Sequence, residues 1–149
     1  MPDSQKHSID IIGEPQECPA GIILPFASEV LAACGRGGVE LAIAFVDDDE
    51  IQRLNLQFRK TDSPTDVLSF PIDDDTPEGK RYLGDVAVSL PTAARQAARQ
   101  RHSLRRELLI LIAHGIIHLC GHDHENDDGE MAALEQSLRQ NLLPRYCEP

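Results

Sequence analysis

The sequence contains no tryptophan and only six other aromatic residues, four phenylalanines and two tyrosines. Proteins that bind single-stranded nucleic acid through base stacking need aromatic side chains, so this chain is poorly supplied for that mode of binding. It also has no apolar run of the length that spans a bilayer. Residues 1–6 are polar and contain no apolar core of an export signal. We therefore expect a cytoplasmic protein with no membrane partner.

Cysteine is also scarce, and its spacing argues against two classes of small protein. The cysteines show neither the paired spacing of a cysteine zinc site nor the density of a disulfide scaffold, which predicts reduced thiols. They are Cys18, Cys34, Cys120 and Cys147. A length of 149 residues with 41% hydrophobic residues predicts one domain, residues 1–149, with a core of its own.

The balance of charge is acidic, with a formal net charge of −11. Taken alone, this charge argues against a nucleic-acid-binding protein, and no DNA partner is expected. Seven cations nevertheless lie between Lys80 and Arg106, where Asp85 is the only acid. This segregation predicts a local basic surface, although the same arginines can form an ordinary solvated helix face. The candidates for contacts with an RNA backbone are Arg95, Arg99, Arg101 and Arg105.

The hydrophobic pattern predicts strands that alternate with helices along the chain. Strands are expected at residues 8–12, 39–46, 67–70 and 82–90, with a polar loop at 73–79. Helices are expected at 20–33, 50–58 and 104–120, from Pro91 onward, and along the apolar stripe that begins at Met131. The predicted fold class is α+β, with a single mixed sheet of about four strands packed with about five helices.

Four of the six histidines lie between residues 114 and 124. His114 and His118 are four residues apart, so on a helix they share one face. Gly121 follows the apolar run, where glycine most easily forms a left-handed cap, and a chain reversed there can return His124 to the pair. Three neutral imidazoles around one point predict a zinc site, one ion per chain, with its fourth position open. Because Cys120 is the only thiol nearby, a catalytic zinc is favoured over a structural one.

One position separates this segment from the zinc peptidases. Their His-Glu-x-x-His pattern places the general base directly after the first histidine, and this chain has Gly115 there. The carboxylate that activates water in a peptidase is therefore missing. Because glycine in mid-helix lowers helix stability, we expect Gly115 to give space to a bound ligand or a close neighbour.

Other polar residues are candidates for the same site. Arg59, between a predicted helix and a predicted strand, suits a bidentate grip on phosphate, or it is a favourable charge at a helix C-terminus. Ser69 can support the site or cap a turn. Glu107 lies seven residues before His114 on the same helix face, where it can position a group of the site or form an ordinary ion pair. Asp123 can orient an imidazole or close the turn.

The histidine segment resembles the hallmark His-Gly-x-Leu-His-Leu-x-Gly-Tyr-Asp-His of the YbeY family of bacterial endoribonucleases, also called ribosomal RNA maturation factors. The chain departs from the hallmark at Ile117, in place of leucine, and at His122, in place of tyrosine. Residues 54–71 and 83–89 are similar to two further family motifs, in the family's order. The positions that match the hallmark are His114, Gly115, His118, Leu119, Gly121, Asp123 and His124.

The resemblance implies a compact α+β domain with a zincin-like arrangement of metal-dependent hydrolases, in which His114, His118 and His124 hold zinc. It implies cleavage of single-stranded RNA, three-prime-end maturation of small-subunit ribosomal RNA, and ribosome quality control. The implied partners are precursor ribosomal RNA and the ribosome or its small-subunit proteins. Arg59 is implied to matter for activity, and Asp85, from the segment 83–89, joins the supporting candidates.

The residues are compatible with three functions. The first is a zinc-dependent endoribonuclease, in which zinc and Arg59 stabilise charge on phosphoryl oxygens while water or a ribose 2′-hydroxyl attacks. The second is a zinc-dependent hydrolase of a peptide or amide bond, which Gly115 disfavours. The third is a non-catalytic ribosome assembly factor with a structural zinc. The role of His122, as a competing ligand or an outward-facing substitute for tyrosine, is also open.

Overall fold

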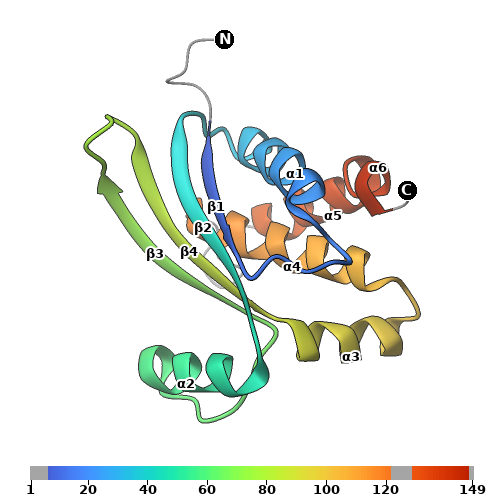
Figure 1. The fold of residues 1–149 in the computed structure, drawn as a ribbon. Coiled ribbons are helices and arrows are strands. Elements are labelled where there is room, and N and C mark those ends of the chain that lie inside the picture. The colour runs from blue at the N-terminus through green and yellow to red at the C-terminus, as the bar shows by residue number, and fades with distance from the viewer. Residues whose placement is uncertain (1–6, 122–128, 148–149) are drawn as a thin grey trace.

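The computed structural model describes residues 7–121 and 129–147. In this part of the chain, four strands form one sheet in the order β1-β2-β4-β3 (Figure 1). β2 pairs in parallel with β1 and β4, whereas β3 pairs antiparallel with β4, so the sheet is mixed, as predicted. The strands are β1 (Ser8–Ile12), β2 (Val39–Val46), β3 (Val67–Asp75) and β4 (Arg81–Ser89).

Six helices surround the sheet in the described residues, which confirms the α+β class. The helix α4 runs through the middle of the molecule, and α1 packs beside it on the same side of the sheet (Figure 1). The helices are α1 (Ala20–Ala33), α2 (Asp48–Arg59), α3 (Leu90–Gln100), α4 (Leu104–Leu119), α5 (Glu130–Asn141) and α6 (Pro144–Cys147).

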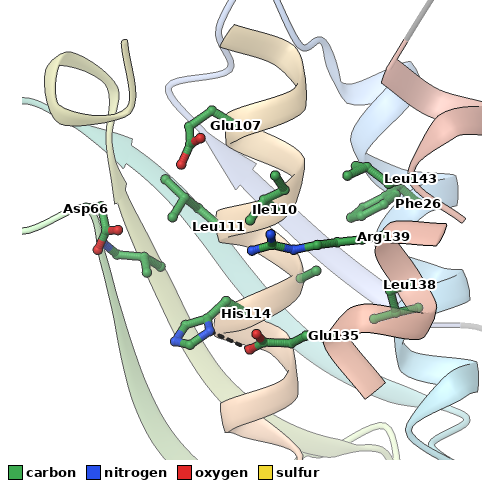
Figure 2. A pocket seen from close by; sticks show the side chains of 12 residues that line it. Phe26, Asp66, Glu107, Ile110, Leu111, His114, Glu135, Leu138, Arg139 and Leu143 are labelled. Atoms are coloured by element: carbon green, nitrogen blue, oxygen red, sulfur yellow. Dashed lines mark hydrogen bonds and ion pairs between the residues drawn. The ribbon is translucent and has the colours of Figure 1, made fainter. Parts of the chain in front are cut away.

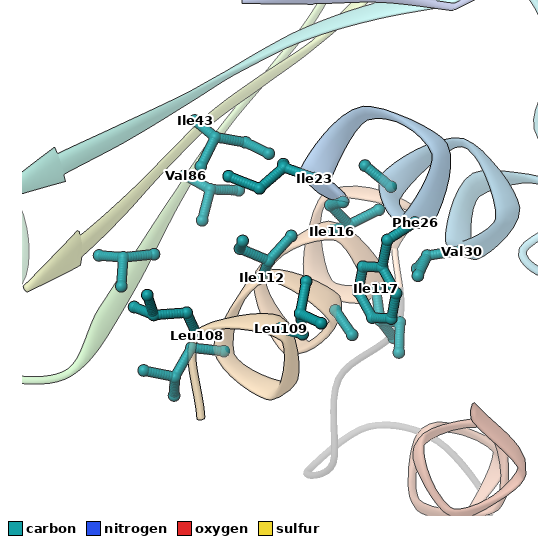
Figure 3. Packing of buried hydrophobic residues seen from close by; sticks show 14 of the residues in the cluster. Ile23, Phe26, Val30, Ile43, Val86, Leu108, Leu109, Ile112, Ile116 and Ile117 are labelled. Atoms are coloured by element: carbon teal, nitrogen blue, oxygen red, sulfur yellow. The ribbon is translucent and has the colours of Figure 1, made fainter. Parts of the chain in front are cut away.

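The main core lies between the sheet, α4 and α1 (Figure 3). Ile112 and Ile116 of α4 are fully buried and belong to one cluster with Ile43 and Val86 of the sheet. Because α4 has the sheet on one side and α1 on the other, apolar residues cover most of its circumference, as expected for a buried helix. Its first turn is capped by Ser103, whose hydroxyl accepts a hydrogen bond from the Arg106 N–H at 3.1 Å.

The opposite face of the sheet is covered in part by α2. Ile51 of this helix packs with Leu68 and Ala87 in a second, smaller buried cluster. Asp47 caps the helix by accepting a hydrogen bond from the Glu50 N–H at 2.8 Å. Near the C-terminus of α2, the ring of Phe58 packs edge-on against Phe70 of the edge strand β3, with the ring centroids 5.0 Å apart.

The strand β3 is longer than the pattern predicted. The expected polar loop at 73–79 is wrong for its first three residues, because β3 continues to Asp75. Acidic residues are unfavourable in strands, but Arg81 in the neighbouring strand forms ion pairs with Asp73 and Asp75, each at 2.8 Å. These cross-strand pairs offset the repulsion between the acids and allow the hairpin to extend.

The C-terminal part of the described chain packs against α4. Met131 and Leu138 of α5 are buried in the main core, in agreement with the predicted apolar stripe. The short helix α6, which contains the buried Cys147, was not predicted. In the segments that the structure describes, no helix combines the length and apolarity needed to cross a membrane.

Candidate active site

The side chains of His114 and His118 converge on the last two turns of α4. Their Nε2 atoms lie 3.2 Å apart, and their ring centroids are separated by 4.6 Å. Two nitrogen ligands of a tetrahedral zinc ion, each about 2.0–2.1 Å from the metal, lie about 3.3 Å apart. The histidine pair therefore has the spacing of two ligands of one ion.

The predicted third ligand, His124, lies outside the described residues, as do Asp123 and His122. Within residues 7–121 and 129–147, no group of three histidine, cysteine, aspartate or glutamate side chains forms a complete metal site. The three-histidine site therefore stays a prediction, of which the structure describes two members.

A carboxylate from another helix orients His114. Nδ1 of His114 lies 2.6 Å from Oε1 of Glu135 in α5, and both side chains are largely shielded from solvent (Figure 2). Because a carboxylate only accepts hydrogen bonds, it places the ring proton on Nδ1 and leaves Nε2 as the electron-pair donor. This arrangement is typical of histidines that bind zinc.

Glu135 was missed in the sequence, although a signal exists. It lies four residues after Met131 and three before Leu138, both of which are buried. An acidic residue on the apolar face of a helix needs a partner in the interior. That pattern predicts a buried polar contact, but it does not say which residue of the chain provides the contact.

Two glycines shape the histidine helix. Gly121 has a φ of +97°, and its N–H donates to the His118 carbonyl at 3.0 Å, which confirms the predicted left-handed cap. A Cβ on Gly115 would lie 2.6 Å from Cγ1 of Val86 in β4. The prediction of a close neighbour is therefore correct: Gly115 allows α4 to approach the sheet. At this point the Ser69 hydroxyl donates to the Gly115 carbonyl at 3.1 Å.

Arg59 lies in the same cavity as the histidine pair. This cavity has a volume of about 320 Å³ and is lined by Arg59, Val67, Leu68, Ser69, His114 and His118. Arg59 is the last residue of α2, and its guanidinium is exposed, with no hydrogen-bond partner among the residues that the structure describes. Arg59 is therefore close to the histidines and free to bind an anion, in agreement with the predicted role in phosphate binding.

The segment after Arg59 is held by a buried asparagine. Asn55 is 3% exposed, and its side-chain amide donates to the Ser63 carbonyl at 2.9 Å. Its backbone carbonyl accepts a hydrogen bond from the Thr61 N–H at 3.3 Å. These bonds fix the connection between α2 and β3, and therefore the position of Arg59 relative to Ser69.

Two of the supporting candidates have partners away from the histidine pair. Oε1 of the buried Glu107 lies 2.6 Å from Nε2 of His102. Asp85 accepts a hydrogen bond from the Tyr82 hydroxyl, and burial together with this bond raises the pKa of Tyr82. Asp85 shares its strand face with Ala87, which packs toward α2 and not toward α4. No contact in the described residues joins Glu107 or Asp85 to the histidine pair, so the supporting role of these two residues stays a prediction.

The four candidate arginines do not form one unpaired cationic surface. Arg95 forms an ion pair with Asp48 at 2.7 Å, and Arg105 donates to the Glu17 carbonyl at 2.9 Å. Arg99 and Arg101 are exposed at the end of α3.

The ion pair of Arg95 also affects its acidic partner. Hydrogen bonds from Ser89, Thr92 and Arg95 lower the pKa of Asp48 to about 2.

The fold and the cavity together define a class of protein. It is an α+β protein whose central helix presents two histidines, spaced like two ligands of one metal ion, to a cleft that is also lined by an arginine, as suits a hydrolase of anionic substrates. The profile of the family described as "Endoribonuclease YbeY" matches residues 23–143. The chain belongs to this family.

Individual relatives agree with the profile. A protein described as endoribonuclease YbeY from Aquifex aeolicus is 49% identical over 123 residues, which cover 83% of this chain and 81% of the relative. The protein of the same description from Roseiflexus castenholzii is 46% identical over 110 residues, 68% of this chain and 69% of the relative. The solution structure of TM1509 from Thermotoga maritima matches with a TM-score of 0.58 and 29% identity, and covers 91% of this chain and 95% of that one.

Proposed function

We propose that this protein is a zinc-dependent endoribonuclease that cleaves single-stranded RNA. The observation that carries the proposal is the convergence of Nε2 of His114 and Nε2 of His118, 3.2 Å apart, in a cavity that Arg59 also lines. Membership of the endoribonuclease YbeY family supports the choice of RNA as the substrate.

His114 and His118 would hold the metal, with His124 as the third ligand. When bound, zinc in a site with an open position supplies Lewis-acid polarisation of the reacting groups at neutral pH. Glu135 keeps the proton of His114 on Nδ1, so that Nε2 faces the cavity as a donor. Ser69 and Gly115 hold α4 close to β4, which keeps the two imidazoles at a fixed distance from the sheet.

Arg59 would bind the scissile phosphate. A guanidinium matches two phosphoryl oxygens with parallel hydrogen bonds and stabilises the charge that develops on them. The exposed position of Arg59 at the mouth of the cavity allows the flexible backbone of a single strand to reach it. Arg99 and Arg101 would contact phosphates farther along the strand.

The cellular role that we propose is maturation of small-subunit ribosomal RNA at its three-prime end, together with ribosome quality control. The support is the resemblance of the three sequence motifs to the family, with precursor ribosomal RNA and the ribosome or small-subunit proteins as partners. A cytoplasmic location agrees with these partners.

The residues around the cavity disfavour hydrolysis of a peptide or amide bond. Gly115 occupies the position of a peptidase general base, and Glu135, the carboxylate next to His114, already accepts the hydrogen bond of that ring. A carboxylate occupied in this way is a poor base for water. The absence of the usual base at position 115 therefore favours phosphodiester over amide chemistry.

The test uses the purified protein with end-labelled single-stranded RNA, with casein, and with a chelator. We expect RNA cleavage that stops on chelation and returns with zinc, and that is lost in His118→Ala. Casein turnover without RNA cleavage would contradict the proposal. Ribosome binding and cell rescue by a cleavage-inactive His118→Ala protein would instead favour the non-catalytic assembly factor.

A further inference from the structure

A second cavity lies beside the candidate active site, between α4, α5 and the start of β3 (Figure 2). Its volume is about 320 Å³, which is at the small end of the range for ligand pockets. His114 and Val67 line both cavities, so the two hollows adjoin at the histidine pair. The apolar part of the wall includes Phe26, Ile110, Leu111, Leu138 and Leu143.

A buried carboxylate faces this second cavity. The side chain of Glu107 is only 8% exposed and points toward the hollow from the N-terminal half of α4 (Figure 2). Oε1 interacts with His102, whereas Oε2 has no hydrogen-bond partner among the described residues. Oε2 is not one of the buried side-chain atoms without a partner, so it is open to the cavity. There it can accept hydrogen bonds from water or from the N–H groups of a ligand.

An arginine enters the same cavity from the opposite wall. The side chain of Arg139 extends from α5 across α4 toward Ile110 and Leu111 (Figure 2). Its guanidinium forms no ion pair within residues 7–121 and 129–147, although Glu107 and Glu135 line the same hollow. A planar set of donors therefore faces the cavity opposite a carboxylate acceptor.

The charge of the wall makes this cavity unsuitable for phosphate. Asp66, Glu107 and Glu135 contribute three carboxylates, against the single guanidinium of Arg139. The Asp66 carboxylate accepts a hydrogen bond from the Val67 N–H at 2.8 Å and another from the side-chain amide of Gln96 at 3.3 Å. An acidic, partly apolar hollow repels an anion but accommodates a flat, neutral ring with donors on its edge.

We infer that this cavity binds the nucleobase next to the scissile phosphate and selects guanine. The inference rests on the proposed function, since the phosphate would lie in the adjoining cavity with Arg59 and the histidine pair. Guanine offers two adjacent N–H groups that match the Glu107 carboxylate, and the acceptors O6 and N7, which match a guanidinium bidentately. Of the four bases, guanine alone offers two adjacent donors to Glu107 together with two adjacent acceptors to Arg139.

The other bases leave one of these residues without a partner. Uracil presents carbonyl oxygens on both sides of its only N–H, and these oppose a carboxylate. Adenine has an amino group and N7, but no adjacent pair of donors for Glu107 and a donor where Arg139 needs an acceptor. Cytosine offers the acceptors N3 and O2 to a guanidinium, but its single amino group cannot give Glu107 two adjacent N–H donors. A site that leaves the buried Glu107 carboxylate without its donors discriminates against the wrong ligand.

The direct test measures binding separately from cleavage. The zinc-loaded full-length protein is titrated into labelled 2′-O-methyl oligouridylates that carry a single guanine, adenine or cytosine, and fluorescence anisotropy gives each Kd. The unsubstituted oligouridylate is the fourth ligand, and we expect the guanine oligonucleotide to bind about tenfold more tightly than the other three. Glu107→Gln and Arg139→Gln are each expected to reduce this preference to about twofold or less.

Arg53→Gln is the matched control, because Arg53 is an exposed arginine of α2 that pairs with Glu50 and lines neither cavity. It should retain the preference for guanine. Arg139 is itself exposed, so Arg139→Gln keeps the test valid if the buried Glu107→Gln fails to fold. Equal affinity for all four oligonucleotides, or loss of the preference in Arg53→Gln, would overturn the inference.

A cleavage experiment distinguishes this inference from the proposed function. In ordinary oligouridylates with one guanosine, the cut should fall at a constant distance from that guanosine. Cleavage at random positions would overturn the guanine pocket while leaving the endoribonuclease intact. Selective guanine binding without any cleavage would contradict the proposed function and leave the pocket standing.

Discussion

Glu135 and His114 lie on different helices and are joined by a hydrogen bond of 2.6 Å between Oε1 and Nδ1. The bond connects α5 to the side of α4 that carries the histidine pair, across 21 positions of sequence. It holds the imidazole in the tautomer and orientation in which Nε2 can bind a metal. The helix α5 is therefore part of the candidate site and not only a cover for the core.

Glu135→Gln should weaken zinc binding, because an amide oxygen is a weaker acceptor and does not raise the basicity of His114. We expect the zinc affinity to fall about 10–100-fold, as measured by competition with a chromophoric chelator. Gln136→Ala, at an exposed neighbouring position of α5, is the control. Unchanged zinc affinity in Glu135→Gln would show that the contact does not act on the metal.

Gly115→Ala should destabilise the protein although alanine favours helices. Its Cβ would meet Cγ1 of Val86 at 2.6 Å, so that α4 must shift from the sheet, at a cost of about 1–3 kcal/mol in the free energy of unfolding. Urea denaturation measures this change. In a Val86→Ala background the cost should largely vanish; an equal cost in both backgrounds would mean that the close approach is not the cause.

Arg59→Glu should abolish RNA cleavage and leave the zinc content unchanged. The substitution replaces a phosphate-binding cation with an anion that repels the substrate, whereas the proposed metal ligands are not altered. Metal analysis and cleavage of labelled RNA are measured on the same preparation. Arg53→Glu is the control for the change in net charge. If zinc is lost together with activity, Arg59 has a structural role instead.

Asp48 should make stability depend on pH in the acid range. Its pKa is lowered to about 2 by hydrogen bonds from Ser89, Thr92 and Arg95, so the ionised form stabilises the folded state. That contribution is present above pH ~4 and is lost as the pH falls toward 2. Because the side chain is partly exposed, we expect Asp48→Asn to cost only about 1 kcal/mol near neutral pH.

The measurement for Asp48 is urea denaturation of both proteins near pH 7 and at about pH 3. The difference between the wild type and Asp48→Asn should be smaller at pH 3, because the Asp48 carboxyl of the unfolded chain is then largely protonated while that of the folded protein is still ionised. A difference that is constant across this range would assign the effect to the geometry of the hydrogen bonds and not to charge.

Local pattern predicted most of the fold. The bounds of α1 and of β2 agree with those expected, since each has a long apolar pattern and a clear end. β3 was predicted too short, because its acidic end depends on Arg81 of the next strand. Strand propensity depends on a residue and its close neighbours in sequence. It therefore does not include the effect of a partner such as Arg81 in the neighbouring strand.

In the candidate site, too, local sequence predicted some features, whereas others depend on contacts between distant parts of the chain. The spacing of His114 and His118 predicts a shared face, and the structure brings their Nε2 atoms together. Arg59 lines the same cavity, and the bond from Asn55 to the Ser63 carbonyl holds the segment that follows it. Glu135 was missed because its role depends on how α5 packs against α4. Pairs within one helix follow from its period, whereas contacts between helices require the tertiary structure.

The most direct test of metal-dependent cleavage is a zinc titration of the chelator-treated protein, with cleavage of labelled single-stranded RNA as the readout. We predict that activity rises linearly and stops rising at one equivalent of zinc per chain, and that His118→Ala shows no such rise. RNA cleavage by the metal-free protein at the full rate, or an identical titration curve for His118→Ala, would contradict a catalytic zinc at the histidine pair.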